Sequence, residues 1–203
     1  MKTRQIVLLG IIFALMITFL IFIPLNAIVP LIALIVIAET ENIKLAGLGG
    51  LLFGVSSFAA ALFFPSTPLY VIFLNPIVSI IPRIIVGLMV FLIYKGIFKL
   101  LSNKFKTDIN DTNNINRRKI RKLQYVSLTI GAISGAIINT TLVMGTIFLF
   151  YTNKTYTLND VSILVRPEVL LPLIAVSAIL EPIFCALIAP PIVIALKHSK
   201  INS

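Results

Sequence analysis

Arg83 has the most specific chemistry in this sequence, because it lies inside a long apolar run, Leu69–Tyr94, directly after Pro82. An arginine within a membrane span costs roughly 2.5–3.5 kcal/mol on insertion scales, so it is usually retained for a role. One role is to bind an anion in a polar cavity. The other is structural, as an ion pair with Glu181 or by reaching toward the outer surface. We expect anion binding, because the adjacent proline frees a backbone carbonyl, as in helices that line cavities.

Two further polar side chains stand in apolar runs, Glu181 before Pro182 and Asn139 before Thr140. A buried carboxyl group can be neutral, can pair with a cation, or can accept hydrogen bonds from a substrate hydroxyl or amide. Amide and hydroxyl side chains within spans commonly bond to one another or to a neighbouring helix. Glu181 and Asn139 are therefore candidates for ligand binding, with internal hydrogen bonding as the open alternative.

The sequence lacks the motifs of common catalytic and ATP-hydrolysing sites. It contains no Gly-x4-Gly-Lys-Ser/Thr loop, no His-Glu-x-x-His and no Gly-x-Ser-x-Gly. Its only histidine is His198, and its only cysteine, Cys185, lies in an apolar run where a small packing residue is expected. We therefore predict that the chain is not an enzyme, has no catalytic residues, holds no metal or cofactor, and does not hydrolyse ATP itself.

These polar residues belong to a chain that is too apolar for a soluble protein. Of its 203 residues, 59% are hydrophobic and only 12% are charged, about half the charged share usual in a soluble domain. The apolar residues fall in long runs, which is the pattern of membrane spans. We predict an all-α integral membrane protein, a single domain over residues 1–203 with six transmembrane helices at Ile6–Ile23, Leu25–Ala38, Leu45–Phe64, Leu69–Tyr94, Tyr125–Tyr151 and Val169–Leu196. The second run is short, so part of it is expected to be irregular or sunken.

The distribution of lysine and arginine predicts the orientation of this bundle. Of the 17 such residues, Arg83 lies inside a span, and Lys154 and Arg166 lie in the segments on one side, the longest of which is a loop over 152–166. The remaining residues lie on the other side. By the positive-inside rule that basic side is cytoplasmic, and both termini are on it. The expected location is a bacterial plasma membrane.

A basic cytoplasmic loop is predicted over residues 101–124, between the fourth and fifth spans. Its run Arg-Arg-Lys-Ile-Arg-Lys over 117–122 is typical of a topology determinant that meets anionic lipid headgroups. A docking role for a cytoplasmic partner is the alternative. The net charge of +10 does not indicate nucleic-acid binding, because the basic residues lie between apolar runs.

Small residues recur at four-residue spacing on the first span, at Gly10, Ala14 and Thr18. This spacing puts all three on one helix face, where a second helix can approach closely. Similar pairs at Gly50 and Gly54, and at 131 and 135, are interpreted as internal packing. The face on the first span could instead serve a helix of another protein.

The segment Leu74–Gly87 reads Leu-Asn-Pro-Ile-Val-Ser-Ile-Ile-Pro-Arg-Ile-Ile-Val-Gly. It resembles the Asn-Pro-x-x-Ser-x-x-Pro-Arg-x-x-x-Gly segment of the substrate-binding S components of energy-coupling factor transporters. The stretch Gly135–Gly145 is similar to the fifth span of that family. The resemblance implies a subunit that binds a small-molecule vitamin at the outer face and assembles with a transmembrane coupling subunit and two ATPase subunits.

The resemblance also implies roles for particular residues. Substrate binding would fall to Arg83, Asn75, Ser79, Asn139 and Glu181. The small-residue face of the first span would meet the transmembrane partner. At that face the family has an Ala-x-x-x-Ala pattern, and this chain has glycine at the first position.

Among vitamins, the sequence is most similar to pantothenate-type S components. Arg83 would suit a carboxylate, and Glu181, Asn139 and Asn75 would suit hydroxyls and an amide. Folate, biotin and niacin also carry carboxylates, so charge alone does not choose among them. Two other classes stay open: a self-sufficient secondary transporter or structural membrane protein, and a small integral-membrane enzyme acting on lipid with Glu181 as its acid or base.

Overall fold

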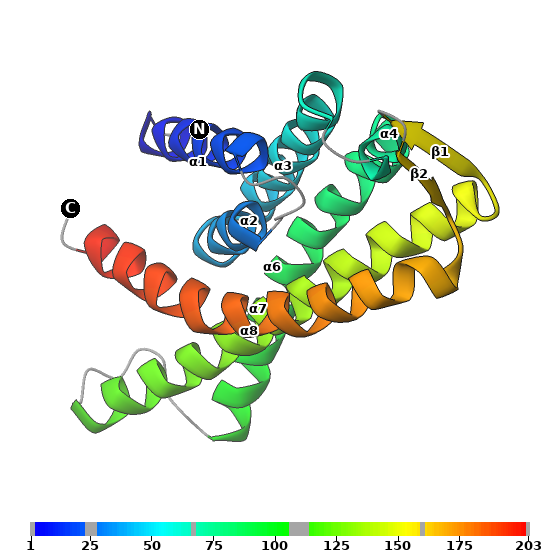
Figure 1. Ribbon diagram of the computed structural model, residues 1–203. Helices are drawn as coiled ribbons and strands as arrows, with labels where there is room; N and C mark the ends of the chain where they lie inside the picture. The colour runs from blue at the N-terminus through cyan, green and yellow to red at the C-terminus, as the bar shows by residue number, and fades with distance from the viewer. Residues whose placement is uncertain (1–2, 23–27, 66–67, 106–113, 159–160, 202–203) are drawn as a thin grey trace.

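The computed structural model describes residues 3–22, 28–65, 68–105, 114–158 and 161–201 (Figure 1). Over these residues the elements are α1 (Thr3–Phe22), α2 (Ile28–Thr40), α3 (Ile43–Phe63), α4 (Leu69–Phe73), α5 (Pro76–Ser79), α6 (Ile81–Lys104), α7 (Asn114–Tyr151), β1 (Thr155–Leu158), β2 (Val161–Leu164) and α8 (Pro167–Ile201). Among the described residues, four stretches are long and apolar enough to cross a membrane, namely Ile43–Phe63, Pro76–Lys104, Arg118–Tyr151 and Pro167–His198. The helical character that the sequence predicts is confirmed, and these four stretches are compatible with a membrane protein; the count of six spans stays a prediction.

The fourth predicted span is not one helix but three, because its prolines interrupt the backbone. Asn75 precedes Pro76 and is extended, with φ −84° and ψ 117°, which is the conformation that a following proline favours. Its side-chain oxygen accepts a hydrogen bond from the N–H of Ile77 at 3.0 Å and so caps α5. A second break at Ile80 precedes α6, whose first turn contains Pro82. The polar residues of this run therefore lie on a kinked entry into α6.

The helices on either side of the predicted basic loop are longer than expected. The fourth span was predicted to end at Tyr94, but α6 continues to Lys104, and α7 begins at Asn114. Both ends of the predicted loop over 101–124 are thus helical, and residues 106–113 lie outside the described part of the chain. With 38 residues, α7 is about 57 Å long, well over the roughly 30 Å of a hydrocarbon core. Its basic first turns extend past its apolar part.

A β-hairpin lies between α7 and α8, where the sequence analysis predicted only a loop, and it departs from the all-α prediction. Strands β1 and β2 pair antiparallel, and Asn153, with φ 63°, turns the chain into them. Tyr156 and Ile163 pack on a buried cluster formed by Leu69, Ile72, Val78, Val143, Ile147, Val165 and Leu170. The hairpin thus covers the end of the bundle where α4 lies (Figure 1).

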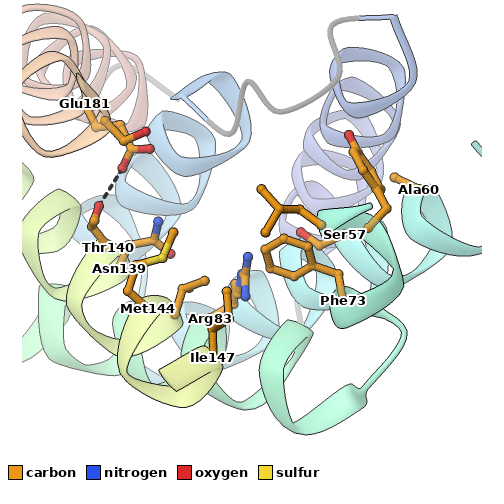
Figure 2. Close-up of a pocket in the computed structure, with 13 residues that line it drawn as sticks. Ser57, Ala60, Phe73, Arg83, Asn139, Thr140, Met144, Ile147 and Glu181 are labelled. Atoms are coloured by element: carbon orange, nitrogen blue, oxygen red, sulfur yellow. Dashed lines mark hydrogen bonds between the residues drawn. The ribbon is translucent and has the colours of Figure 1, made fainter. Parts of the chain in front are cut away.

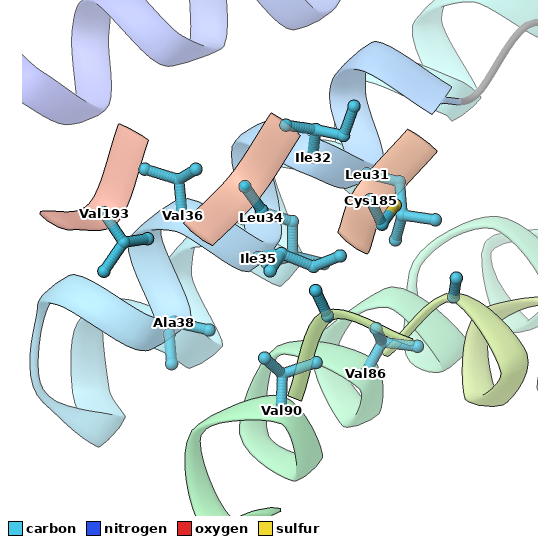
Figure 3. Close-up of a cluster of buried hydrophobic side chains, with 14 of the residues drawn as sticks. Leu31, Ile32, Leu34, Ile35, Val36, Ala38, Val86, Val90, Cys185 and Val193 are labelled. Carbon is cyan, nitrogen blue, oxygen red and sulfur yellow. The ribbon is translucent and has the colours of Figure 1, made fainter. Parts of the chain in front are cut away.

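The short second helix forms the core of the bundle. With 13 residues, α2 is about 20 Å long, and it contacts α1, α3, α6, α7 and α8. Its buried side chains pack against those of the surrounding helices, including Val86, Val90, Cys185 and Val193 (Figure 3). The expectation that the second run is sunken agrees with this position. Cys185 is a buried free thiol in the same cluster, as expected of a packing residue.

Two glycines allow α3 to lie directly against the kinked segment. A methyl group on Gly50 would lie 2.7 Å from Cα of Ile84 and would also collide with the carbonyl of Arg83. A methyl group on Gly54 would lie 2.6 Å from Cα of Ile80. These are contacts with backbone, which cannot move aside as a flexible side chain can. The pair predicted from sequence as internal packing does pack internally, on the segment that holds Arg83.

We expect Gly50→Ala to destabilise the protein, because α3 and α6 must separate to admit the methyl group. Overpacking of this kind costs about 1–3 kcal/mol, which outweighs the gain of up to about 1 kcal/mol from replacing a helical glycine. The measurement is the melting temperature of the purified protein in detergent. Gly145→Ala is the matched control, since nothing lies within 4 Å of its added methyl group. Equal melting temperatures for the two variants would contradict the close approach of α3.

Candidate functional site

A cavity of about 150 Å³ lies between α3, α4, α6, α7 and α8. It is lined by Ser57, Ala60, Leu69, Tyr70, Phe73, Arg83, Asn139, Thr140, Val143, Met144, Ile147, Ser177 and Glu181 (Figure 2). Most of these side chains are apolar or aromatic, and the polar ones converge from different helices. That combination is typical of small-molecule sites.

Arg83 brings the positive charge into this cavity from the first turn of α6. Its side chain is 4% exposed, and one terminal nitrogen donates a hydrogen bond to the carbonyl of Val78 at 2.5 Å. The guanidinium carbon lies 5.1 Å from the ring centre of Phe73 and 5.6 Å from that of Phe53, within the range of cation–π attraction. Its Nε–H has no hydrogen-bond partner within the described protein. A buried guanidinium with an unused donor is suited to an incoming acceptor.

The backbone near Arg83 adds to the attraction for an anion. The side chain stands at the N-terminal end of α6, a helix of 24 residues, where the helix dipole is positive. That dipole opposes a cation and favours an anion at the same place. An anionic group between Arg83 and the start of α6 would therefore be stabilised by both, whereas the arginine alone is not.

A second polar group faces Arg83 across the cavity, from α7 and α8. The Oε2 atom of Glu181 accepts a hydrogen bond from the hydroxyl of Thr140 at 3.0 Å. Asn139 is 4% exposed, and its Oδ1 accepts no hydrogen bond from the described residues. These oxygens are acceptors, so this side of the cavity suits a ligand group that donates, such as a hydroxyl or an amide N–H.

The alternative in which Arg83 and Glu181 form a structural ion pair has no direct contact to support it. Each of the two groups is bonded elsewhere, Arg83 to Val78 and Glu181 to Thr140. Figure 2 shows them on separate sides of the cavity. Their opposite charges act on each other through the space that a ligand would fill, rather than through a shared hydrogen bond.

Asn75 and Ser79, the other two predicted binding residues, lie outside the residues that line the cavity. The Nδ2 of Asn75 donates to the hydroxyl of Tyr151 at 2.8 Å. Ser79 is fully buried, and its hydroxyl donates to the carbonyl of Asn75 at 3.1 Å. Both side chains thus fix the kinked segment whose Val78 carbonyl holds Arg83. They therefore support the backbone segment that positions Arg83 and do not line the cavity themselves.

Several cavity residues were not singled out from the sequence. Ser57 and Ser177 stand in runs of small and apolar residues, and Tyr70 stands at the start of α4. The sequence shows each of them as a hydroxyl-bearing residue within an apolar run. That pattern does not identify the helix face on which the hydroxyl lies. A methionine in a span is ordinarily a packing residue, so the residue type of Met144 does not indicate a place in a binding site.

The small-residue face of α1 is left uncovered by the rest of the described chain. Gly10, Ala14 and Thr18 are all exposed, and nothing lies within 4 Å of a methyl group placed on Gly10. The hydroxyl of Thr18 is turned onto its own helix, where it donates to the carbonyl of Ala14 at 2.8 Å. The face therefore carries only small side chains, and its one hydroxyl is already bonded within α1.

No protein-family model matches the sequence, and the search of curated proteins finds no match. The described residues hold no group of three or more histidine, cysteine, aspartate or glutamate side chains that could bind a metal ion.

We expect loss of the Asn75–Tyr151 hydrogen bond to loosen the kinked segment. Tyr151→Phe should lower stability by about 0.5–1.5 kcal/mol, the usual net contribution of one hydrogen bond. Asn75→Ala should cost more, because it also removes the cap of α5, which contributes about 0.5–2 kcal/mol. Melting temperatures in detergent measure both. Tyr156→Phe, which removes a hydroxyl from the neighbouring ring without touching Asn75, is the control. An Asn75→Ala protein as stable as wild type would contradict the stabilising role of this hydrogen bond and of the α5 cap.

Proposed function

We propose that the chain is the membrane-embedded substrate-binding subunit of an energy-coupling factor importer, and that it captures a small carboxylate vitamin of the pantothenate type, the type of subunit that its sequence resembles. The observation that carries the proposal is the buried Arg83, held in a cavity with an unused N–H donor. A guanidinium can hold a carboxylate by two parallel hydrogen bonds. The acceptors on Asn139 and Glu181 would then take the hydroxyl or amide donors of the same molecule.

The position of the cavity supports capture from outside. The hairpin and α4 lie at the same end of the bundle (Figure 1), and α4 lines the cavity. The basic ends of α6 and α7 lie at the opposite end. By the positive-inside rule that opposite end is cytoplasmic, so the cavity opens toward the outer half of the membrane. Six crossings follow if α1, α2, α3, the α4–α6 unit, α7 and α8 each count as one.

The cavity is small for its proposed ligand, and the proposal includes a local movement. A space of about 150 Å³ holds a molecule of about the size of benzene, whereas a vitamin with an extended chain is larger. Met144 and Phe73 line the cavity and are only partly buried. Displacement of the Met144 side chain would enlarge the space from the α7 side. Displacement of Phe73 would enlarge it from the α4 side and would break the cation–π contact with Arg83.

The chain has binding groups but no motif for ATP hydrolysis, so energy must come from a partner. The exposed face of Gly10, Ala14 and Thr18 supports this division of labour, because close packing of α1 on a partner helix needs small side chains. A transmembrane coupling subunit with two ATPase subunits is the assembly that the sequence motif implies. A secondary transporter would need none of these partners, and the uptake experiment below separates the two classes.

We expect Arg83→Ala to remain folded and to bind the carboxylate vitamin about thirty-fold to several thousand-fold more weakly, the effect of losing one partner of a desolvated charged pair, about 2–5 kcal/mol. Arg83→Lys should recover only part, because lysine cannot form the two parallel bonds. Isothermal titration calorimetry on the purified proteins measures both. Lys154→Ala removes an exposed charge as the control. Wild-type affinity in folded Arg83→Ala would remove this residue from the site. If Arg83→Ala unfolds and a second substitution, Glu181→Gln, restores folding, Arg83 has a structural role as an ion-pair partner.

We expect Gly10→Leu combined with Ala14→Leu to abolish energised uptake and to leave binding by the isolated protein nearly unchanged. The bulky side chains would hold a partner helix away. Both positions are exposed, and no described residue lies within 4 Å of a methyl group placed on Gly10. Uptake of labelled vitamin in cells and calorimetry on the purified protein are the two readouts. Gly96→Leu adds similar bulk at another open position and is the control. Uptake that persists in the double variant, or that occurs without any partner, points instead to a self-sufficient transporter.

A further inference from the structure

A second buried polar site lies at the other end of the helices from the cavity. Glu39, next to the last residue of α2, is 2% exposed, and neither of its carboxylate oxygens accepts a hydrogen bond from the part of the chain that the structure describes. Its neighbour Gly131 lies eight residues before Asn139 on α7, about 12 Å along the helix. Its other neighbour Lys197 lies sixteen residues after Glu181 on α8, about 24 Å. Glu39 is thus separate from the cavity, and the proposed ligand does not reach it.

The packing around Glu39 leaves its carboxyl group closely enclosed. A methyl group on Gly131 would collide with Oε1 of Glu39 and would lie 3.4 Å from Cβ of Tyr94. The glycine therefore provides the space that the carboxyl group occupies. Ala38, Val90 and Val193 belong to the buried apolar cluster at this end of α2 (Figure 3). The side chains of Ala38, Val90 and Val193 carry no hydrogen-bond donor for a carboxylate.

The charged and titratable groups that face Glu39 are few. Tyr94 comes from α6, and Lys197 and Cys185 come from α8, while α7 brings Gly131, which has no side chain. Lys197 attracts the Glu39 charge electrostatically. However, its ammonium donates to the hydroxyl of Tyr94 at 2.8 Å and lies 4.4 Å from the centre of that ring. Tyr94 therefore holds the nearest cation in a position where it makes no hydrogen bond with the carboxyl oxygens.

An ionised carboxylate in such a place would cost several kcal/mol, because no hydrogen bond from the described residues replaces its lost hydration. Uptake of one proton removes the charge and most of this cost. We propose that Glu39 is a proton-binding site: one carboxylate oxygen takes a proton from water at the inner end of the bundle and holds it as an O–H group while the helices are packed. The proton is returned to water when Lys197 leaves Tyr94 and its ammonium pairs with the carboxylate.

The test is infrared spectroscopy of the full-length purified protein at neutral pH, with ¹³C-labelled glutamate. We expect a protonated carboxyl band in the wild type, and we expect the band to persist in Glu181→Gln, which removes the only other deeply buried glutamate among the described residues. Glu39→Gln should abolish the Glu39 component. Glu41→Gln, two residues away and accepting a hydrogen bond from Gln5 at 3.0 Å, is the control and should leave the band unchanged.

Absence of a protonated glutamate band from the Glu181→Gln protein at neutral pH would overturn the proposal, and this result needs no variant at Glu39. Tyr94→Phe tests the role of Lys197: the carboxyl component should shrink, because the ammonium is released to pair with Glu39. An unchanged component in Tyr94→Phe would overturn that exchange. If Glu39→Gln does not fold, Glu39→Met replaces it, since a thioether leaves no polar group unpaired. A band that survives Glu39→Met combined with Glu181→Gln would also overturn the assignment.

Discussion

The hydrogen bond from Arg83 to the carbonyl of Val78 is the contact on which the cavity depends. In an unbroken helix that carbonyl would accept from a backbone N–H four residues on, and Pro82 has no N–H to give. The breaks at Asn75 and Ile80 turn the short α5 so that this unused acceptor points at the guanidinium. The carbonyl that the proline leaves unpaired thus holds the buried guanidinium in a fixed position. Tyr151, Ser79 and the glycines of α3 all hold the same segment in place.

The two buried acids of the bundle show how one residue type takes different roles by its surroundings. Glu181 has Thr140 as a donor and faces an open cavity with a cation on its far side. Glu39 has apolar neighbours and a backbone glycine, and the closest ammonium is bound to Tyr94. The first environment gives the carboxyl group a hydrogen-bond donor and a distant opposite charge, which offset part of the cost of its burial, and it presents an acceptor to the cavity. The second disfavours charge and leaves protonation as the way to reduce the cost of burial.

The general fold and the central site residues could be predicted because they follow from composition. Arginine, glutamate and asparagine in apolar runs are rare and costly, so Arg83, Glu181 and Asn139 stood out without any knowledge of their orientation. Asn75 and Ser79 were predicted from the resemblance of the segment Leu74–Gly87 to a family motif. The direction of their side chains depends on where the helix restarts after Pro76, which a motif does not give. The hairpin was missed because two four-residue strands carry little signal beside long apolar runs. Glu39 was missed because it stands at the end of its run, where an acidic residue is ordinarily taken for a solvated cap.

The close contact of α3 with the kinked segment has a consequence for how ligand preference can change. Gly50 and Gly54 meet backbone, so no larger side chain fits there without moving Arg83. The side of the cavity formed by α3 and α6 therefore tolerates few substitutions, and the positive charge of Arg83 keeps its position there. Met144, on the α7 wall, is only partly buried, and its flexible side chain can be exchanged at low cost. Under the proposed function, a change of ligand, in nature or by design, would therefore retain Arg83 and would arise by substitutions of single side chains on α7 and α8.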